Sequence, residues 1–94
     1  MSFRKKAKFI LPLKPDILVV PECEHPDKLI FPDGTQIPTN IIWHGDNKNK
    51  GLGVFSYNNY KLKLLKIHNP LFKNILPIQV TGDSSKFILF AIWA

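Results

Sequence analysis

The sequence predicts an α/β domain in which antiparallel strands form a sandwich with helices outside, and two observations support this. Apolar residues recur at helical spacing over residues 2–13, and Pro12 and Pro15 end or kink this helix because proline lacks the N–H group that a helix interior requires. The run from Ile17 to Val20 follows and is apolar at every position, which is typical of a strand buried on both faces. A helix leading directly into such a strand favours α/β over all-β.

Five further strands are predicted after an irregular segment at residues 21–38, which has room for one short helical turn. Asn58 and Asn59 form a strong tight-turn signal between two of these strands, and residues 82–85 form another turn. A series of hairpins is expected to give antiparallel sheets. The predicted strands span residues 41–44, 52–57, 60–68, 76–81 and 86–93.

The composition is that of one small folded domain covering residues 1–94. Hydrophobic residues make up 45% of the chain and charged residues 21%, which argues against a disordered chain. No apolar run reaches the roughly 18–20 residues that a membrane span needs, and the N-terminus does not resemble a signal peptide. Cys23 stands alone and cannot form an internal disulfide. We therefore expect a soluble, cytoplasmic protein with no membrane partner.

A net charge of +6 suggests an anionic partner, such as nucleic acid or a phosphate group. Four of the positive charges belong to the predicted N-terminal helix, at Arg4, Lys5, Lys6 and Lys8. A basic helical face beside an apolar stripe is more often plain solvated surface than a binding site. Charge alone therefore does not identify a partner.

Candidate metal ligands follow the predicted buried strand, where Glu22 and Glu24 lie two residues apart. Ligands commonly gather beyond the carboxyl ends of strands in α/β sheets. In an extended backbone both carboxylates would point to the same side, where their repulsion favours a bound divalent cation. The alternative is a solvated acidic turn with Lys28 as counter-charge. His44 and His68 have no evident serine or cysteine partner, so a nucleophilic triad is not predicted.

Three segments, taken in order, resemble the endonuclease/exonuclease/phosphatase family, the metal-dependent phosphodiesterases related to DNase I. The first is residues 14–22, which lead through the apolar strand to Glu22, although Pro21 stands where the family customarily has Gln. The others are the glycine strand at residues 50–56 and the late apolar strand at residues 86–93.

The resemblance implies a four-layer α/β/β/α sandwich of the DNase I-like type, with Glu22 as a ligand of Mg²⁺ or Mn²⁺. Lys50, at the start of the glycine strand, becomes a candidate neighbour of the substrate phosphate. The complete domain would hydrolyse phosphate esters, with nucleic acid, a nucleotide or a phospholipid headgroup as substrate, and the sequence does not choose among these.

Most of the family's catalytic residues have no counterpart in the 94 residues. A first strand ending in Asn, an Asp-x-Asn motif and a final Asp-His pair would all lie outside the chain, so the resemblance implies a partial domain truncated at both ends. Hydrolysis at phosphorus needs a cation and a group that activates water. Because Glu22 supplies one metal ligand and no base, we expect the chain to be inactive by itself.

The alternative function is a non-catalytic binding or assembly module that uses the basic helix and exposed strand edges. The strand from Phe87 to Trp93 has no polar face, and an unpaired apolar edge invites strand addition, so this strand is a candidate for forming a homo-oligomer unless the sandwich buries it. A third interpretation is a basic nucleic-acid binder that stacks bases on Trp43, Phe55 and Tyr57, although Phe55 and Tyr57 share a face more typical of a core.

Overall fold

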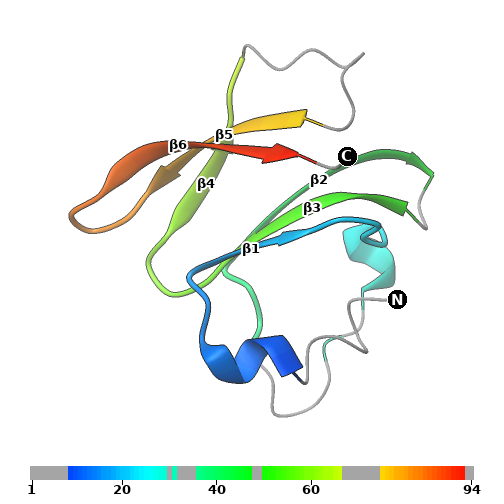
Figure 1. The fold of residues 1–94 in the computed structure, drawn as a ribbon, viewed down its shortest axis with the longest axis horizontal. Helices are drawn as coiled ribbons and strands as arrows, with labels where there is room; N and C mark the ends of the chain where they lie inside the picture. Colours follow the sequence, from blue (N-terminus) through cyan, green and yellow to red (C-terminus); the bar gives the residue numbers. More distant parts are fainter. Residues whose placement is uncertain (1–8, 30, 32–35, 48–49, 67–74, 93–94) are drawn as a thin grey trace.

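The computed structural model of the protein describes residues 9–29, 31, 36–47, 50–66 and 75–92, which form two three-stranded antiparallel sheets (Figure 1). The first sheet has the strand order β1-β3-β2, and the second sheet has the order β4-β5-β6. Short 3-10 helices, η1 and η2, precede and follow β1. The elements are η1 (Leu11–Leu13), β1 (Ile17–Val20), η2 (Pro26–Lys28), β2 (Asn40–Asn47), β3 (Lys50–Ser56), β4 (Lys61–Leu64), β5 (Ile75–Thr81) and β6 (Lys86–Ile92).

The predicted α/β class is wrong, because the described residues form an all-β arrangement with no helix of seven or more residues. The four-layer α/β/β/α sandwich is therefore not found. Every strand pair is antiparallel, and antiparallel neighbours need no helical crossover to join them. Of the predicted N-terminal helix, residues 9–13 are described, and they end in the 3-10 turn that contains Pro12. No helix in these ranges is long and apolar enough to cross a membrane.

β3 lies at the centre of the first sheet and is buried on both faces. Its side chains alternate between two environments, as those of any strand do. Leu52 and Val54 pack toward the second sheet, whereas Phe55, with Tyr57 just beyond the strand, packs toward the N-terminal segments. The strand predicted at residues 52–57 is thus confirmed, with its start moved to Lys50.

Two hydrophobic cores result, one on each face of the first sheet. The first core lies between this sheet and the irregular segments on either side of β1, and the second core lies between the two sheets. Irregular segments thus contribute directly to the cover of the first sheet. The buried members are Leu11, Val20, Cys23, Phe55 and Tyr57 in the first core, and Leu52, Val54, Leu76, Ile78, Val80 and Ala91 in the second.

The sequence located the strands better than it identified the fold class. Ile17–Val20 forms β1 as predicted, although β1 is an edge strand whose side chains are mostly half-buried. The turn at Asn58 is also confirmed, with a left-handed backbone of φ 61 at that residue. β4 ends at Leu64 and so before the predicted residue 68, while residues 67–74 lie outside the described ranges.

β6 occupies an edge of the second sheet, and most of its side chains stay exposed. Leu89 and Ala91 pack on the second core. Ile88, Phe90 and Ile92 alternate with them and point to the opposite face, where they are 49%, 54% and 61% exposed. The sandwich therefore does not bury this strand. The predicted last residue of the strand lies outside the described ranges.

Candidate functional site

Glu22, the predicted metal ligand, lies exposed in a tight turn directly after β1. Its backbone is left-handed, with φ 52, so the chain reverses sharply after Pro21. The next residue returns to the sheet, where the Cys23 N–H donates to the Gly51 carbonyl at 2.7 Å. The turn therefore projects from an anchored point, with the β1–β3 ladder before it and this hydrogen bond after it.

The backbone between β1 and Glu24 is not extended at Glu22. The prediction that both carboxylates point to one side assumed an extended backbone, and Glu22 does not have one. Glu24 is half-buried, and its carbonyl oxygen accepts a hydrogen bond from the Cys23 thiol at 3.3 Å. Across the described ranges, no three His, Cys, Asp or Glu side chains come together in a way that could hold a metal ion. Among the described residues, Glu22 therefore belongs to no such cluster.

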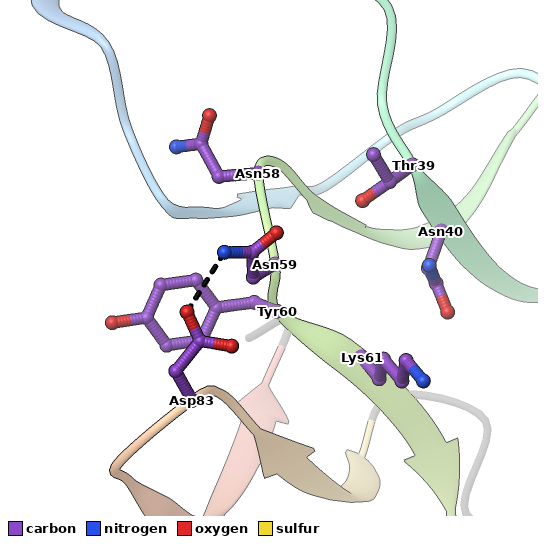
Figure 2. A pocket seen from close by; sticks show the side chains of 7 residues that line it. All are labelled: Thr39, Asn40, Asn58, Asn59, Tyr60, Lys61 and Asp83. Carbon is purple, nitrogen blue, oxygen red and sulfur yellow. Dashed lines mark hydrogen bonds between the residues drawn. The ribbon is translucent and has the colours of Figure 1, made fainter.

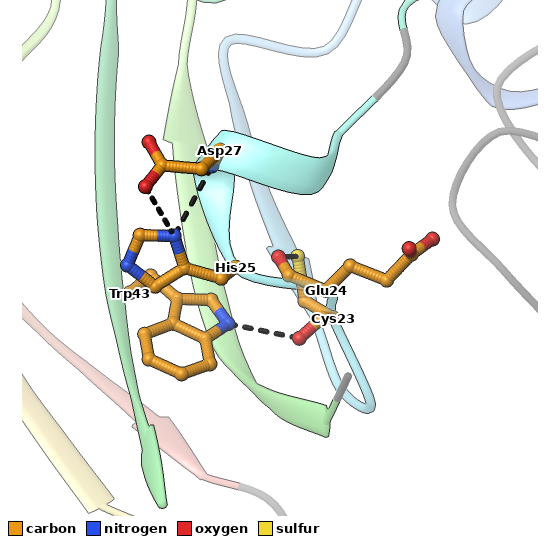
Figure 3. A network of polar contacts seen from close by, with 5 residues as sticks. All are labelled: Cys23, Glu24, His25, Asp27 and Trp43. Carbon is orange, nitrogen blue, oxygen red and sulfur yellow. Dashed lines mark hydrogen bonds and ion pairs between the residues drawn. The ribbon is translucent and has the colours of Figure 1, made fainter. Parts of the chain in front are cut away.

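Polar contacts join the segment after Glu22 to β2 (Figure 3). The Trp43 indole N–H donates to the Cys23 carbonyl at 2.8 Å, and the rings of His25 and Trp43 meet edge to face with centroids 4.8 Å apart. His25 Nδ1 accepts from the Asp27 N–H at 3.1 Å and so caps η2. The Asp27 carboxylate lies 3.5 Å from the same Nδ1 atom, but its side chain is 83% exposed, so water screens this contact. The network is structural.

Cys23 has the chemistry of a core residue. Burial, reinforced by the charge of Glu24, raises the pKa of its thiol to about 12. The thiolate is the form that attacks electrophiles and binds metals, and it is essentially absent at neutral pH with this pKa. The nearby His25 is therefore not part of a nucleophilic Cys–His pair.

The two glycines of β3 make room for side chains of the same network. A Cβ atom at Gly51 would overlap the Trp43 indole, and one at Gly53 would lie 2.9 Å from Cys23 Sγ. A glycine inside a strand often marks a place where another group approaches closely. The approaching groups are the protein's own side chains.

Lys50, the candidate phosphate neighbour, begins β3 and is exposed. It pairs with Asn47 across the β2–β3 ladder. The following residue, Gly51, is hydrogen-bonded to the residue that follows Glu22. Lys50 and Glu22 therefore belong to the same end of the first sheet.

The other residues that the sequence offered as functional candidates are two histidines and two aromatic residues. His44 is half-buried on β2, opposite Leu52 of β3, and His68 lies outside the described ranges. Phe55 and Tyr57 are fully buried in the first core, which confirms the core interpretation of their shared face and removes them as base-stacking residues.

A polar pocket of about 350 Å³ lies at the opposite end of β3 from Glu22 (Figure 2). It bridges the two sheets, because its residues come from the start of β2, the connection from β3 into β4, and the turn between β5 and β6. The sequence indicated the turn at Asn58 and Asn59 but not the pocket, since the lining residues are distant in the chain. They are Thr39, Asn40, Asn58, Asn59, Tyr60, Lys61 and Asp83.

Hydrogen bonds within the protein engage the amides of this polar pocket. Asn59 Nδ2 donates to Asp83 Oδ2 at 2.8 Å, and Asn58 Nδ2 donates to Asp16 Oδ1 at 3.2 Å. Asn40 Oδ1 accepts from the Leu62 N–H at 3.5 Å. The contact of Asn40 with Leu62 joins β2 of the first sheet to β4 of the second, and the contact of Asn59 with Asp83 joins the β3–β4 connection to the β5–β6 turn. The pocket therefore lies at a seam between the two sheets.

Comparison of the chain with family models, with curated proteins and with solved structures gave no match.

Proposed function

We propose that the chain contributes Glu22 as a metal-binding carboxylate to a Mg²⁺-dependent phosphodiesterase or nuclease, and that it does not hydrolyse phosphate esters by itself. The pairing of β1 with β3 is the observation that carries the proposal. Two of the segments on which the family resemblance rests, residues 14–22 and 50–56, are neighbours in the first sheet, with Val20 opposite Gly53. The Glu22 turn thus meets the glycine strand.

The backbone of Glu22 supports a role for its side chain. A left-handed conformation costs a residue other than glycine roughly 1–2 kcal/mol, and such residues cluster at functional sites. Glycine would avoid this cost at φ 52. The carboxylate that glutamate presents here is exposed, and it makes none of the hydrogen bonds that anchor the turn.

The donor chemistry at this end of the sheet fits Mg²⁺ better than Zn²⁺. Mg²⁺ keeps several waters and is often held by one or two carboxylates together with substrate phosphate oxygens, whereas zinc sites need three or four protein ligands. Glu22 supplies one such ligand, and Lys50 would attract the phosphate. A bound Mg²⁺ would stabilise negative charge on a phosphate ester. Because the described residues offer no cluster of three or more such ligands, binding to this chain is expected in the millimolar range.

The test is titration of the ¹⁵N-labelled chain with MgCl₂ and MnCl₂, followed by NMR. Perturbation is expected at the Glu22 turn and at Gly51, with half-saturation at millimolar metal. The variant Glu22→Gln should lose the response, and the matched variant Glu24→Gln should keep it. An unchanged response in Glu22→Gln, or no response in the native chain at tens of millimolar metal, would refute the proposal.

The variant Glu22→Gly separates function from folding at the same position. Relief of the left-handed strain should raise the free energy of unfolding by about 1 kcal/mol. The metal response should disappear, because the carboxylate is gone. Loss of stability in this variant would show that the glutamate side chain serves the fold.

We also propose a cytoplasmic location. The cysteine of the chain, Cys23, is a buried free thiol, and buried reduced thiols are typical of proteins in reducing compartments. Fractionation of cells that express the protein would test this, and recovery from an oxidising compartment would contradict it.

A further inference from the structure

The four sheet edges of the described ranges differ in how well they are protected from pairing with another chain. Proteins protect edges with short strands, irregular pairing, or lysine side chains. β1 has four residues, and β2 has a register shift between His44 and Asn47. β4 also has four residues, of which Lys61 and Lys63 are exposed. Each of these three edges carries at least one protective feature.

β6 carries none of these features. It is seven residues long, pairs with β5 without a register shift, and contains no proline. Its one charged residue is Lys86, at the first position. Phe87, Ile88, Phe90 and Ile92 are 42–61% exposed, so the unprotected edge is also strongly apolar. A long apolar edge strand of this kind is a template for strand addition.

We propose that two copies of the chain associate by antiparallel pairing of their β6 strands, with the two-fold axis at Leu89. This register overlaps all seven residues and joins the second sheets of both copies into one six-stranded sheet. Leu89 of one copy would lie opposite Leu89 of the other. Ile88 of each copy would lie opposite the partner's Phe90, so this pair occurs two times in the dimer. Pairs of aromatic and β-branched residues are among the favourable cross-strand combinations. The inference does not depend on metal binding at Glu22.

The charge of β6 favours a second copy over a differently charged partner strand. In this register Lys86 lies opposite the uncharged Ile92 of the other copy. The two Lys86 residues stand at opposite ends of the ladder, about 20 Å apart at the usual rise per residue. This separation exceeds the screening length of about 8 Å at physiological ionic strength, so the lysines do not oppose pairing. An acidic partner strand could form an ion pair with only one side chain of β6, that of Lys86.

The area available predicts a reversible dimer. The exposed apolar side chains of β6 present about 400 Å² per copy, taking roughly 200 Å² for each whole side chain. Pairing side by side covers the strand backbones and the flanks of these side chains but leaves their outer face in water, so the buried area stays below the roughly 1,000 Å² of a stable specific interface. We therefore expect a weak, reversible dimer.

Sedimentation velocity over a range of concentrations tests the association, with two matched variants. Phe90→Lys places two positive charges about 7–8 Å apart across the strand pair and should weaken the dimer by at least tenfold. Phe9→Lys makes the same change at a residue that is 79% exposed elsewhere, and should leave the dimer unchanged. Both variants should keep the native circular dichroism spectrum. A native chain that is monomeric at millimolar concentration, or equal effects of the two variants, would overturn the inference.

Disulfide trapping tests the register. Chains carrying Ile88→Cys are mixed with chains carrying Phe90→Cys, because these positions face each other when Leu89 lies on the axis. Disulfide-linked heterodimers should exceed both homodimers, and Cys23 should not react because it is fully buried. Equal yields of all three species would reject the register. If the native protein formed open-ended oligomers that grow with concentration, β6 would be pairing with a different edge, and the closed dimer would be rejected.

Discussion

The two sheets of the protein have the same number of strands and the same antiparallel pairing, but they differ in how they are covered. The first sheet has a core on each face, so every residue of its central strand from Gly51 to Ser56 is buried. The second sheet has a core on one face, and its edge strand β6 leaves most side chains exposed. Irregular segments carrying Leu11 and Cys23 make the difference by closing the first sheet.

Two phenylalanines show what the difference means for individual residues. Phe55 of β3 is fully buried, whereas Phe90 of β6 is 54% exposed. Both lie in strands of seven residues, and the strand that contains Phe90 is the more apolar of the two. Hydrophobicity in a strand therefore indicates that a face can be covered, and the surroundings decide whether this chain covers it.

The largest effect is expected from truncating these two residues. Phe55→Ala should lower the free energy of unfolding by about 3–5 kcal/mol, because it removes a filled core position and leaves a cavity. Phe90→Ala should cost less than about 0.5 kcal/mol in the monomer, since its ring is largely in water. Urea denaturation at low protein concentration measures both values. Similar losses for the two variants would mean that the face of β6 is covered.

The second effect is a dependence of the free energy of unfolding on pH. It arises from Cys23, whose side chain is part of the first core. Burial raises the pKa of its thiol from 9.0 to about 12, so the folded state favours the protonated thiol. Its stabilising contribution is complete below pH 9 and is lost as pH rises from 9 toward 12, by up to about 1.4 kcal/mol per pH unit. Unfolding free energies at pH 8, 9 and 10 test this. Cys23→Ala should flatten the decline between pH 9 and 10, and an equal decline in the variant would refute it.

A smaller change in the free energy of unfolding, this time a gain in stability, is expected at Tyr57 in the first core. Its hydroxyl is buried without a hydrogen-bond partner among the described residues, and burial raises its pKa to about 12. Tyr57→Phe removes the unpaired group and should stabilise the protein by about 1 kcal/mol. Tyr60→Phe, at a half-buried position, is the matched control and should change stability little. A loss of more than 1 kcal/mol in Tyr57→Phe would show that the hydroxyl has a partner, such as a buried water.

The smallest effect concerns the seam between the two sheets. Asn59 donates to Asp83 at 2.8 Å, but both residues are exposed, so water competes for the bond. Asn59→Ala and Asp83→Ala should each cost less than about 1 kcal/mol, with a coupling energy near 0.5 kcal/mol in a double-mutant cycle. A coupling energy of several kcal/mol would mean that this bond, and not the second core, holds the sheets together.

Local sequence patterns predicted much of the fold and part of the candidate site. Local patterns were sufficient to place the strand Ile17–Val20, the tight turn at Asn58 and the exposed position of Glu22 beyond β1. The two strands on either side of Asn58 belong to different sheets, so this turn does not form a hairpin. The fold class was predicted wrongly, because that prediction depended on one amphipathic segment and on a family resemblance. The expected common side of Glu22 and Glu24 assumed an extended backbone, and Glu22 has a left-handed one instead. The polar pocket was missed because it assembles residues from three distant connections.

The sequence by itself determined where the strands and the tight turn at Asn58 lie, because alternation and turn chemistry are properties of neighbouring residues. The tertiary structure alone decided which strand faces are covered. Gly51 and Gly53 acquired their packing role only when Trp43 and Cys23 came to lie beside β3. Burial depends on contacts between segments far apart in the chain, so β3 became the buried centre of one sheet and the more apolar β6 became the exposed edge of the other.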